Sequence, residues 1–135
     1  MLAVDSTGFT GHLVLLDVLF LLLHTALIFF NLFGWAWSKT RRLNLLSIAL
    51  TAGAWFVFAP WYGLGYCPCT DWHWQVKAAL GETDLPGNYL TYLFDAWTGI
   101  AITDAFASNL AWICLAPALV LSVALNFRDW RKRRH

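Results

Sequence analysis

The sequence predicts an all-α integral membrane protein with three transmembrane helices and two short extracytoplasmic helices that lie at the interface and cap the bundle. Of its 135 residues, 59% are hydrophobic and only 13% are charged, and the apolar residues gather in three long runs. A soluble domain carries about 25% charged and about 45–50% apolar residues. Because one small core cannot bury so large an apolar surplus, we expect residues 1–135 to form a single membrane domain. The net charge of +1, without a long basic face, argues against binding of nucleic acid.

The three apolar runs define the predicted spans. The first covers about residues 12–37 and, at about 1.5 Å per residue, exceeds a hydrocarbon core of roughly 30 Å, so it would cross with some tilt. The second covers about residues 43–62 and ends near Pro60, a helix stop signal. The third covers about residues 104–127. Pro117 inside this run predicts a kink without a break, because neighbouring helices can satisfy the backbone group that a proline frees.

The basic residues predict the orientation. Eight of the nine lie between the first two spans or after the third, and three spans place all eight on one side. The ninth, Lys77, lies among acidic residues in the segment between the second and third spans. The positive-inside rule then puts the amino terminus outside and the carboxyl terminus in the cytoplasm. A fourth span over residues 89–106 would bury Asp95 and Asp104 and separate the basic clusters, so we expect three.

Residues 63–103 form the predicted outer cap. A short helix over residues 72–80 is stopped by Gly81, and a second one begins at Asn88 and ends at Gly99. The polar residues of the second helix keep to one narrow stripe. Such a helix would lie along the membrane interface or cover the bundle from outside.

Three polar residues interrupt the first span at intervals of seven, namely Asp17, His24 and Asn31. Seven residues are nearly two helical turns, so these side chains share one face. A charged group in mid-membrane costs at least about 2.5–3.5 kcal/mol, which predicts that this face points into the bundle. Two interpretations remain open: interhelical hydrogen bonds worth about 0.6 kcal/mol each, or a ligand site, proton path or cofactor pocket.

Depth in the membrane suggests partners for this polar face. Asn31 is expected in an inner cluster with Ser47, Thr51 and Ser122. His24 is expected near the midplane, where a carbonyl freed by the proline of the third span could accept its N–H. Asp17 is expected within reach of the outer loop.

The densest chemistry lies in the outer loop GYCPCTDWHW, where four side chains alternate at intervals of two. These are Cys67, Cys69, Asp71 and His73. If the loop is extended, they share one side and could bind a metal, although metal sites more often use C-x₂₋₄-C spacing. A Cys67–Cys69 disulfide would close a strained, labile ring. In the third interpretation the loop is only ordered structure, with Pro68 stiffening a turn and Thr70 or Asp71 capping a helix.

Three segments, LHTALIFFNLFGW, GYCPCTDWHWQVKAALGETDLPGNYLTYLFD and NFRDWRKRR, resemble a family of small bacterial inner-membrane proteins of unknown function with a Cys-Pro-x-Thr outer loop. The resemblance implies a fold and a location in the bacterial inner membrane, but no reaction. By position it singles out His24, Gly34, Cys67, Pro68, Thr70, Asp71 and Trp72. The sequence departs from the family pattern at Cys69, where an apolar residue such as leucine is usual, and this weakens any mechanism that needs both cysteines.

These observations predict a non-enzymatic protein that binds a ligand or partner in a polar pocket under the aromatic outer cap. Its partners would be the lipid bilayer and either a small hydrophobic ligand or a larger membrane complex, and no metal is assigned. The predicted pocket comprises Asp17, His24, Asn31, Cys67, Asp71, Trp72 and His73. The alternative is a thiol- or haem-based membrane redox protein that uses Cys67 and Cys69, or His24.

Overall fold

The computed structural model describes residues 2–63 and 66–135, with side chains from residue 8 onward, and shows the predicted all-helical class. No strand occurs among these residues. The elements are α1 (Leu2–Phe33), the 3₁₀ turn η1 (Gly34–Ala36), α2 (Arg41–Val57), α3 (Ala59–Tyr62), α4 (Pro68–Ala79), α5 (Tyr89–Thr98) and α6 (Asp104–Arg134).

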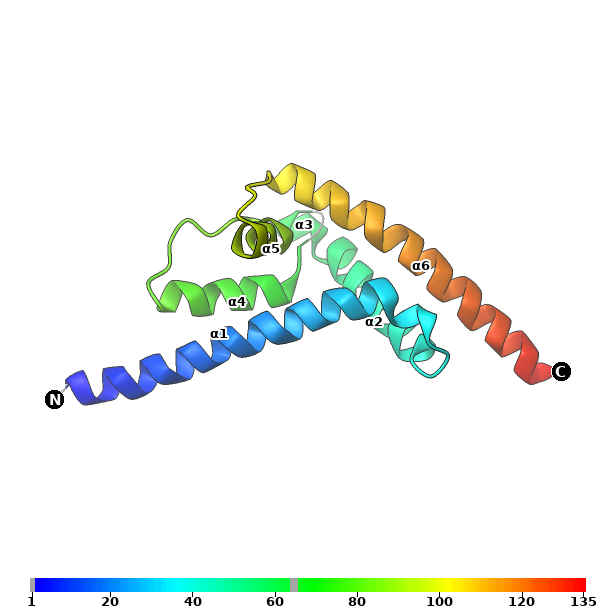
Figure 1. Cartoon of the computed structure of the whole chain (residues 1–135), viewed down its shortest axis with the longest axis horizontal. Helices are drawn as coiled ribbons and strands as arrows, with labels where there is room; N and C mark the ends of the chain where they lie inside the picture. Colours follow the sequence, from blue (N-terminus) through cyan, green and yellow to red (C-terminus); the bar gives the residue numbers. More distant parts are fainter. Residues whose placement is uncertain (1, 64–65) are drawn as a thin grey trace.

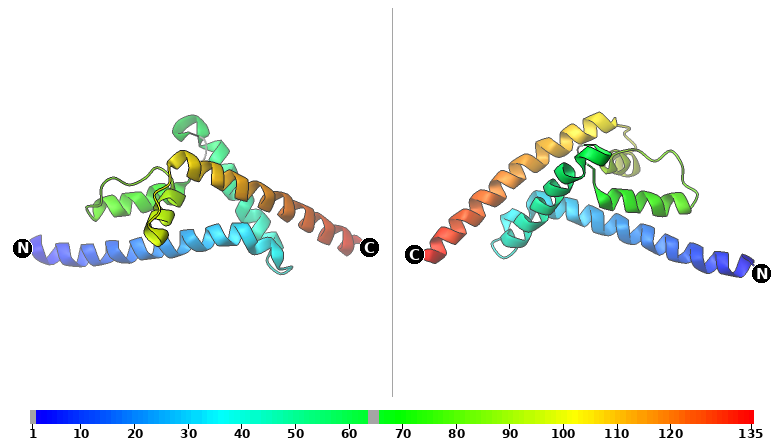
Figure 2. Two further views of the ribbon diagram at one scale, coloured as in Figure 1. Left: turned by 45° about the horizontal axis from the view of Figure 1, so that its top comes forward. Right: turned by 180° about the vertical axis from the view of Figure 1, so that it is seen from behind.

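Two long helices, α1 and α6, set the shape of the molecule (Figure 1). They are inclined to each other, and the two chain termini lie at opposite ends of the long axis. Helix α4 runs beside the middle of α1, whereas α2 packs against both α1 and α6. Helix α5 extends from the start of α6 towards α1 (Figure 2). Helices α4 and α5 therefore lie between the two long helices where these diverge.

Two of the three predicted spans have the length and composition to cross a membrane. The segments are Gly8–Ala36, whose apolar 18-residue window has a mean hydropathy of 2.6, and Asp104–Arg134, whose window has 2.1. Helix α1 begins before the predicted residue 12, at Leu2, and ends at Phe33, short of the predicted residue 37. Helix α6 continues through Pro117 and past the predicted residue 127 to Arg134.

The predicted second span, residues 43–62, is not one continuous helix, so three spans are not confirmed. Helix α2 has 17 residues and ends at Val57, and the four-residue α3 follows. Pro60 explains the break, because its ring lacks an N–H donor and clashes with the carbonyl four residues earlier. A 17-residue helix is about 25 Å long, less than a hydrocarbon core of about 30 Å.

The two helices of the predicted outer cap differ in how well the sequence predicts them. Helix α5 begins and ends as expected: the Asn88 side chain accepts a hydrogen bond from the Leu90 amide at 2.9 Å, and Gly99 closes it with a φ of 71°. The competing span over residues 89–106 is not formed, because α5 ends at Thr98 and a separate helix, α6, begins at Asp104. Helix α4 begins at Pro68, a turn earlier than predicted. Proline is favoured at the first helical position because that N–H has no intrahelical partner anyway.

The two basic clusters lie at the same end of the molecule. Arg41 at the start of α2 pairs with Asp129 near the end of α6 at 2.9 Å. The Asn126 side chain also donates to the Arg41 carbonyl at 3.0 Å. Between α2 and α6 lies a small apolar core of Ile48, Leu115 and Ala118. Most large apolar side chains of α1 and α6 are instead exposed.

Candidate functional site

A cavity of about 1110 Å³ lies among α1, α2, α4, α5 and α6. Its size slightly exceeds the usual range of small-molecule sites, about 300–1000 Å³. The wall is mostly apolar, with Leu27, Leu50, Trp55, Phe94 and Leu110 among its members. All three cysteines of the chain line it as well: Cys67, Cys69 and Cys114. The arrangement provides a largely apolar chamber with polar and thiol groups on part of its wall.

His24 occupies the centre of the α1 polar face and lines this cavity. Its ring stacks on Tyr89 of α5 with a centroid separation of 3.9 Å, and its Nε2 lies 3.8 Å from the Cys67 Sγ. The residue is 5% exposed, and its Nδ1 has no hydrogen-bond partner among the described residues. The Tyr89 hydroxyl is held in turn by the Leu21 carbonyl and the Thr25 hydroxyl, each at 3.4 Å. The expected bond from His24 to the third span is wrong, because the start of α4 and α5 cover the ring instead.

Asp17 joins α1 to α4 through two buried side chains. His73 donates from Nε2 to its carboxylate at 2.6 Å, and the Lys77 Nζ lies 3.1 Å from the same oxygen. His73 is fully buried and Lys77 is 3% exposed. Burial alone would lower the pKa of Lys77, but Tyr92 and Asp17 outweigh it and raise that pKa above its ordinary value. The predicted contact of the aspartate with the outer loop is confirmed, and it fastens α4 along α1.

Asn31 makes the expected cluster with α2. Its Nδ2 donates to the Thr51 hydroxyl at 3.0 Å, and its Oδ1 accepts from the Ser47 hydroxyl at 2.6 Å. Ser122 does not join this cluster but lies beside Asn126 on its own helix. The three polar residues of α1 therefore contact different parts of the chain: α4, then the start of α4 with α5, then α2.

The alternating loop residues do not form one extended, one-sided set. Pro68 begins a helix, and residues two apart on a helix point in nearly opposite directions. Among the described residues, no group of three or more His, Cys, Asp and Glu is placed to hold a metal ion. Cys67 and Cys69 are free thiols, and burial raises the pKa of Cys69. Asp71 accepts a hydrogen bond from the Tyr66 hydroxyl at 2.8 Å, which raises the pKa of Tyr66 to about 12.

The structure divides the predicted pocket residues into two groups. Five of them line the cavity: His24, Asn31, Cys67, Asp71 and Trp72. Asp17 and His73 are not among its lining residues and form the buried contact between α1 and α4.

Sequence reasoning missed two members of the site, Lys77 and Tyr89. Lys77 could have been found, because it follows His73 by four residues and so shares its helix face. Tyr89 gives no local signal, since only the tertiary fold brings its ring onto His24.

The fold and the cavity define a class: an all-helical protein that lines a largely apolar, open cavity and has two helices long and apolar enough to cross a membrane. Residues 14–127 match the family described as "Protein of Unknown function (DUF2784)". This match covers most of the chain, so the protein belongs to that family, and the expected membership of a family of unknown function is confirmed. No curated protein and no solved structure matches the chain.

Proposed function

We propose that this chain is a small polytopic protein of the bacterial inner membrane that binds a small hydrophobic ligand and catalyses no reaction. The observation that carries the proposal is the cavity of about 1110 Å³, whose wall comes from α1 to α6. A largely apolar chamber with a few placed polar groups is typical of small-molecule sites.

The membrane assignment rests on how little of the long helices is buried. In their most apolar windows, only 6% of the residues of α1 and 17% of those of α6 are buried. A core helix of a soluble protein would have most of this surface covered. We propose that α2 and α3 together form a third span, because the Arg41–Asp129 pair then lies with both basic clusters at one membrane face. The amino terminus would face outward and the carboxyl terminus the cytoplasm.

Reporter fusions at the two ends test this topology. A periplasm-active reporter should work only at the amino terminus, and a cytoplasm-active one only at the carboxyl terminus. Activity of the same reporter at both ends would refute an odd number of spans.

The cavity wall suggests the chemistry of the ligand. Its apolar part fits a hydrocarbon body, and the side chains of His24 and Asn31 in the same wall could contact one polar group on the ligand. Trp72 and Trp97, which are 56% and 58% exposed, lie on the cap and line the same cavity. We therefore propose an amphiphilic small molecule with a single polar end.

Native mass spectrometry of protein extracted from its own membranes tests ligand binding. We expect a bound molecule in the wild type and its loss in Ala111→Trp, which fills the cavity from α6. Ala116→Trp is the matched control, because it makes the same change at an exposed position of α6 that does not line the cavity. Equal retention in both variants, or no bound molecule in the wild type, would contradict the proposal. A copurifying protein that disappears with Ala111→Trp would indicate a larger complex instead.

The contact between Cys67 and His24 favours a second candidate, a membrane redox protein. Their 3.8 Å separation places the thiol in contact with an imidazole, and thiol exchange requires a thiolate. Thiol counting with and without reductant, comparing Cys67→Ser with the control Cys114→Ser, tests it, and a visible absorption spectrum tests haem binding by His24. Unchanged thiol counts and the absence of a Soret band would exclude both forms.

A further inference from the structure

A second cavity, of about 400 Å³, lies at the basic end of the molecule between the start of α2 and the last turns of α6. Four of its lining side chains are cationic, namely Lys39, Arg41, Arg42 and Arg133, and one is acidic, Asp129. It is separate from the cavity under the outer cap and shares no lining residue with it. Its wall therefore carries a formal excess of three positive charges.

The acidic residue of this cavity is already paired. The Arg41 Nη1 donates to both carboxylate oxygens of Asp129, at 2.9 and 3.2 Å, and its Nε donates to the Trp35 carbonyl at 2.9 Å. Arg41 is thereby fixed in place and neutralises the carboxylate. Among the described residues, Lys39, Arg42 and Arg133 have no acidic side chain within ion-pair distance.

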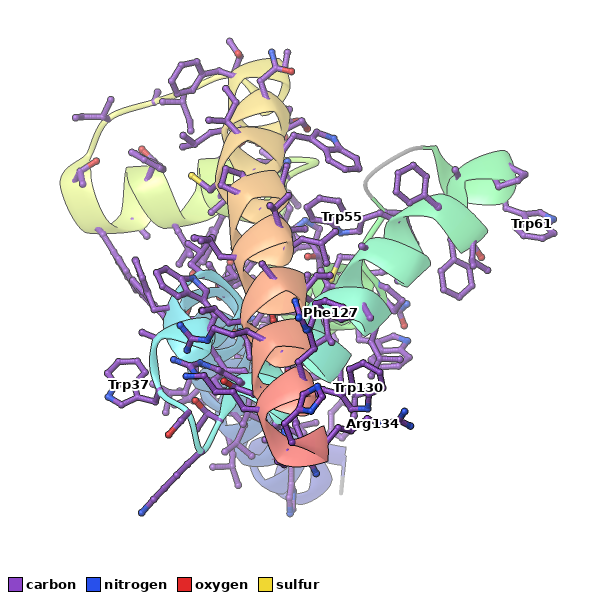
Figure 3. The ribbon with its side chains drawn as sticks, turned by 90° about the vertical axis from the view of Figure 1, so that its right-hand side faces the viewer. Trp37, Trp55, Trp61, Phe127, Trp130 and Arg134 are labelled. Carbon is purple, nitrogen blue, oxygen red and sulfur yellow. The ribbon has the colours of Figure 1, made fainter. Side chains whose placement is uncertain are left out.

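Other cations at the same end are arranged differently. The guanidinium of Arg134 lies 4.4 Å from the centre of the Trp130 ring, and that of Arg131 lies 6.0 Å from the Phe127 ring. Figure 3 shows Phe127, Trp130 and Arg134 along the last turns of α6. None of these residues lines the cavity. The basic end thus contains one group of cations that faces a shared cavity and another that covers aromatic rings.

The group of cations that faces the cavity indicates which kind of ligand it binds. Arginine forks match the oxygens of a phosphate, and basic pockets between helices at the cytoplasmic side of a membrane bind anionic head groups. We infer that the cavity binds a phosphate-bearing anion, either the head group of an anionic phospholipid or free phosphate. Lys39, Arg42 and Arg133 supply the unpaired charge, and the Arg41–Asp129 pair keeps the two helices in register around it.

The test compares two double variants that remove equal charge from the same end of the full chain. Arg42→Gln with Arg133→Gln removes two cavity cations, whereas Lys132→Gln with Arg134→Gln removes two cations outside the cavity. Binding of short-chain phosphatidylglycerol, and separately of inorganic phosphate, is titrated by native mass spectrometry in neutral detergent. Circular dichroism checks that the variants keep their helix content, and Arg42→Lys with Arg133→Lys preserves the charge if the glutamines disturb folding.

The expected result is a loss of about a hundredfold in affinity for the cavity variant, since each charge-assisted hydrogen bond is worth about tenfold or more. The control variant should bind nearly as well as the wild type, and the lysine variant should bind between the two. Tighter binding of phosphatidylglycerol than of inorganic phosphate would identify a lipid as the source, and equal binding would identify free phosphate. Equal losses in the two glutamine variants would show diffuse charge attraction and overturn the inference, as would the absence of binding by the wild type.

Discussion

Replacing Lys77 with methionine measures how strongly the buried ion pair holds α4 against α1. Its Nζ lies 3.1 Å from the Asp17 carboxylate. At an effective dielectric constant of about 20, two unit charges at this distance attract by about 5 kcal/mol before desolvation is counted. The Asp17 side chain is 23% exposed and keeps His73 as a partner, so less than half of this attraction should appear as a loss of stability when Lys77 is replaced. We expect Lys77→Met to lower the free energy of unfolding by about 2 kcal/mol.

A double-mutant cycle isolates this interaction from other effects of the substitution. The free energy of unfolding is measured by SDS titration in mixed micelles, with circular dichroism, for the wild type, Lys77→Met, Asp17→Asn and the double variant. We expect a coupling energy of about 2 kcal/mol, with the double variant less destabilised than the sum of the single ones. Asp17→Asn combined with Arg41→Gln, at the opposite end of the bundle, serves as the control and should be additive within about 0.5 kcal/mol. Additivity in the Asp17–Lys77 cycle would refute the interpretation that this pair fastens α4.

The same pair predicts a dependence on pH. Since the pKa of Lys77 is raised in the folded state, its contribution is fully present below the ordinary lysine pKa of about 10.4 and is lost as the pH rises through the raised value. Asn31→Leu should cost about 1 kcal/mol by the same titration, because it removes two hydrogen bonds to α2. Gly34→Ala should destabilise the protein by about 1–3 kcal/mol, because the added Cβ would lie 2.8 Å from the side-chain amide nitrogen of Asn44 in α2. Gly53→Ala, in open space within α2, should instead stabilise it by about 0.5–1 kcal/mol. In an ultraviolet titration one phenol should ionise near pH 12, and Tyr66→Phe should remove this transition. Because the pKa of Tyr66 is higher in the folded than in the unfolded state, the stability that the Tyr66 hydroxyl contributes is lost as the pH rises from about 10 to 12.

The helical class and the polar face of α1 could be predicted because both depend on local periodicity. Asp17, His24 and Asn31 recur every seven residues, and any helix places such residues on one face. Depth in the membrane also predicted that Asn31 contacts α2. Ser47 and Thr51 on that helix are about as many residues from the basic cluster as Asn31 is on α1. These inferences need only the geometry of one helix and the order of its neighbours.

The start of α4 could not be predicted in the same way, because two periods overlap there. Cys67, Cys69, Asp71 and His73 alternate like the residues of an extended segment, whereas His73 and Lys77 have the spacing of a helix. Packing against α1 decides between the two, since only a helix presents both of those side chains to Asp17. That packing is tertiary information, and so is the stack between His24 and Tyr89.

The cavity itself follows from how the helices are held together. The apolar core between α2 and α6 is small, and α1 meets the rest of the chain at separated polar points along one face. In a bilayer, as we propose, lipid chains are as apolar as the helix surfaces and give little force to close the gaps between such points. Helices fastened at Asp17 and at Asn31 can therefore diverge where nothing apolar draws them together, and His24 lies midway between these two points. His24 lines the cavity, whereas Asp17 and His73 do not, which is why we expect the ligand beside His24 rather than at the buried contact between α1 and α4.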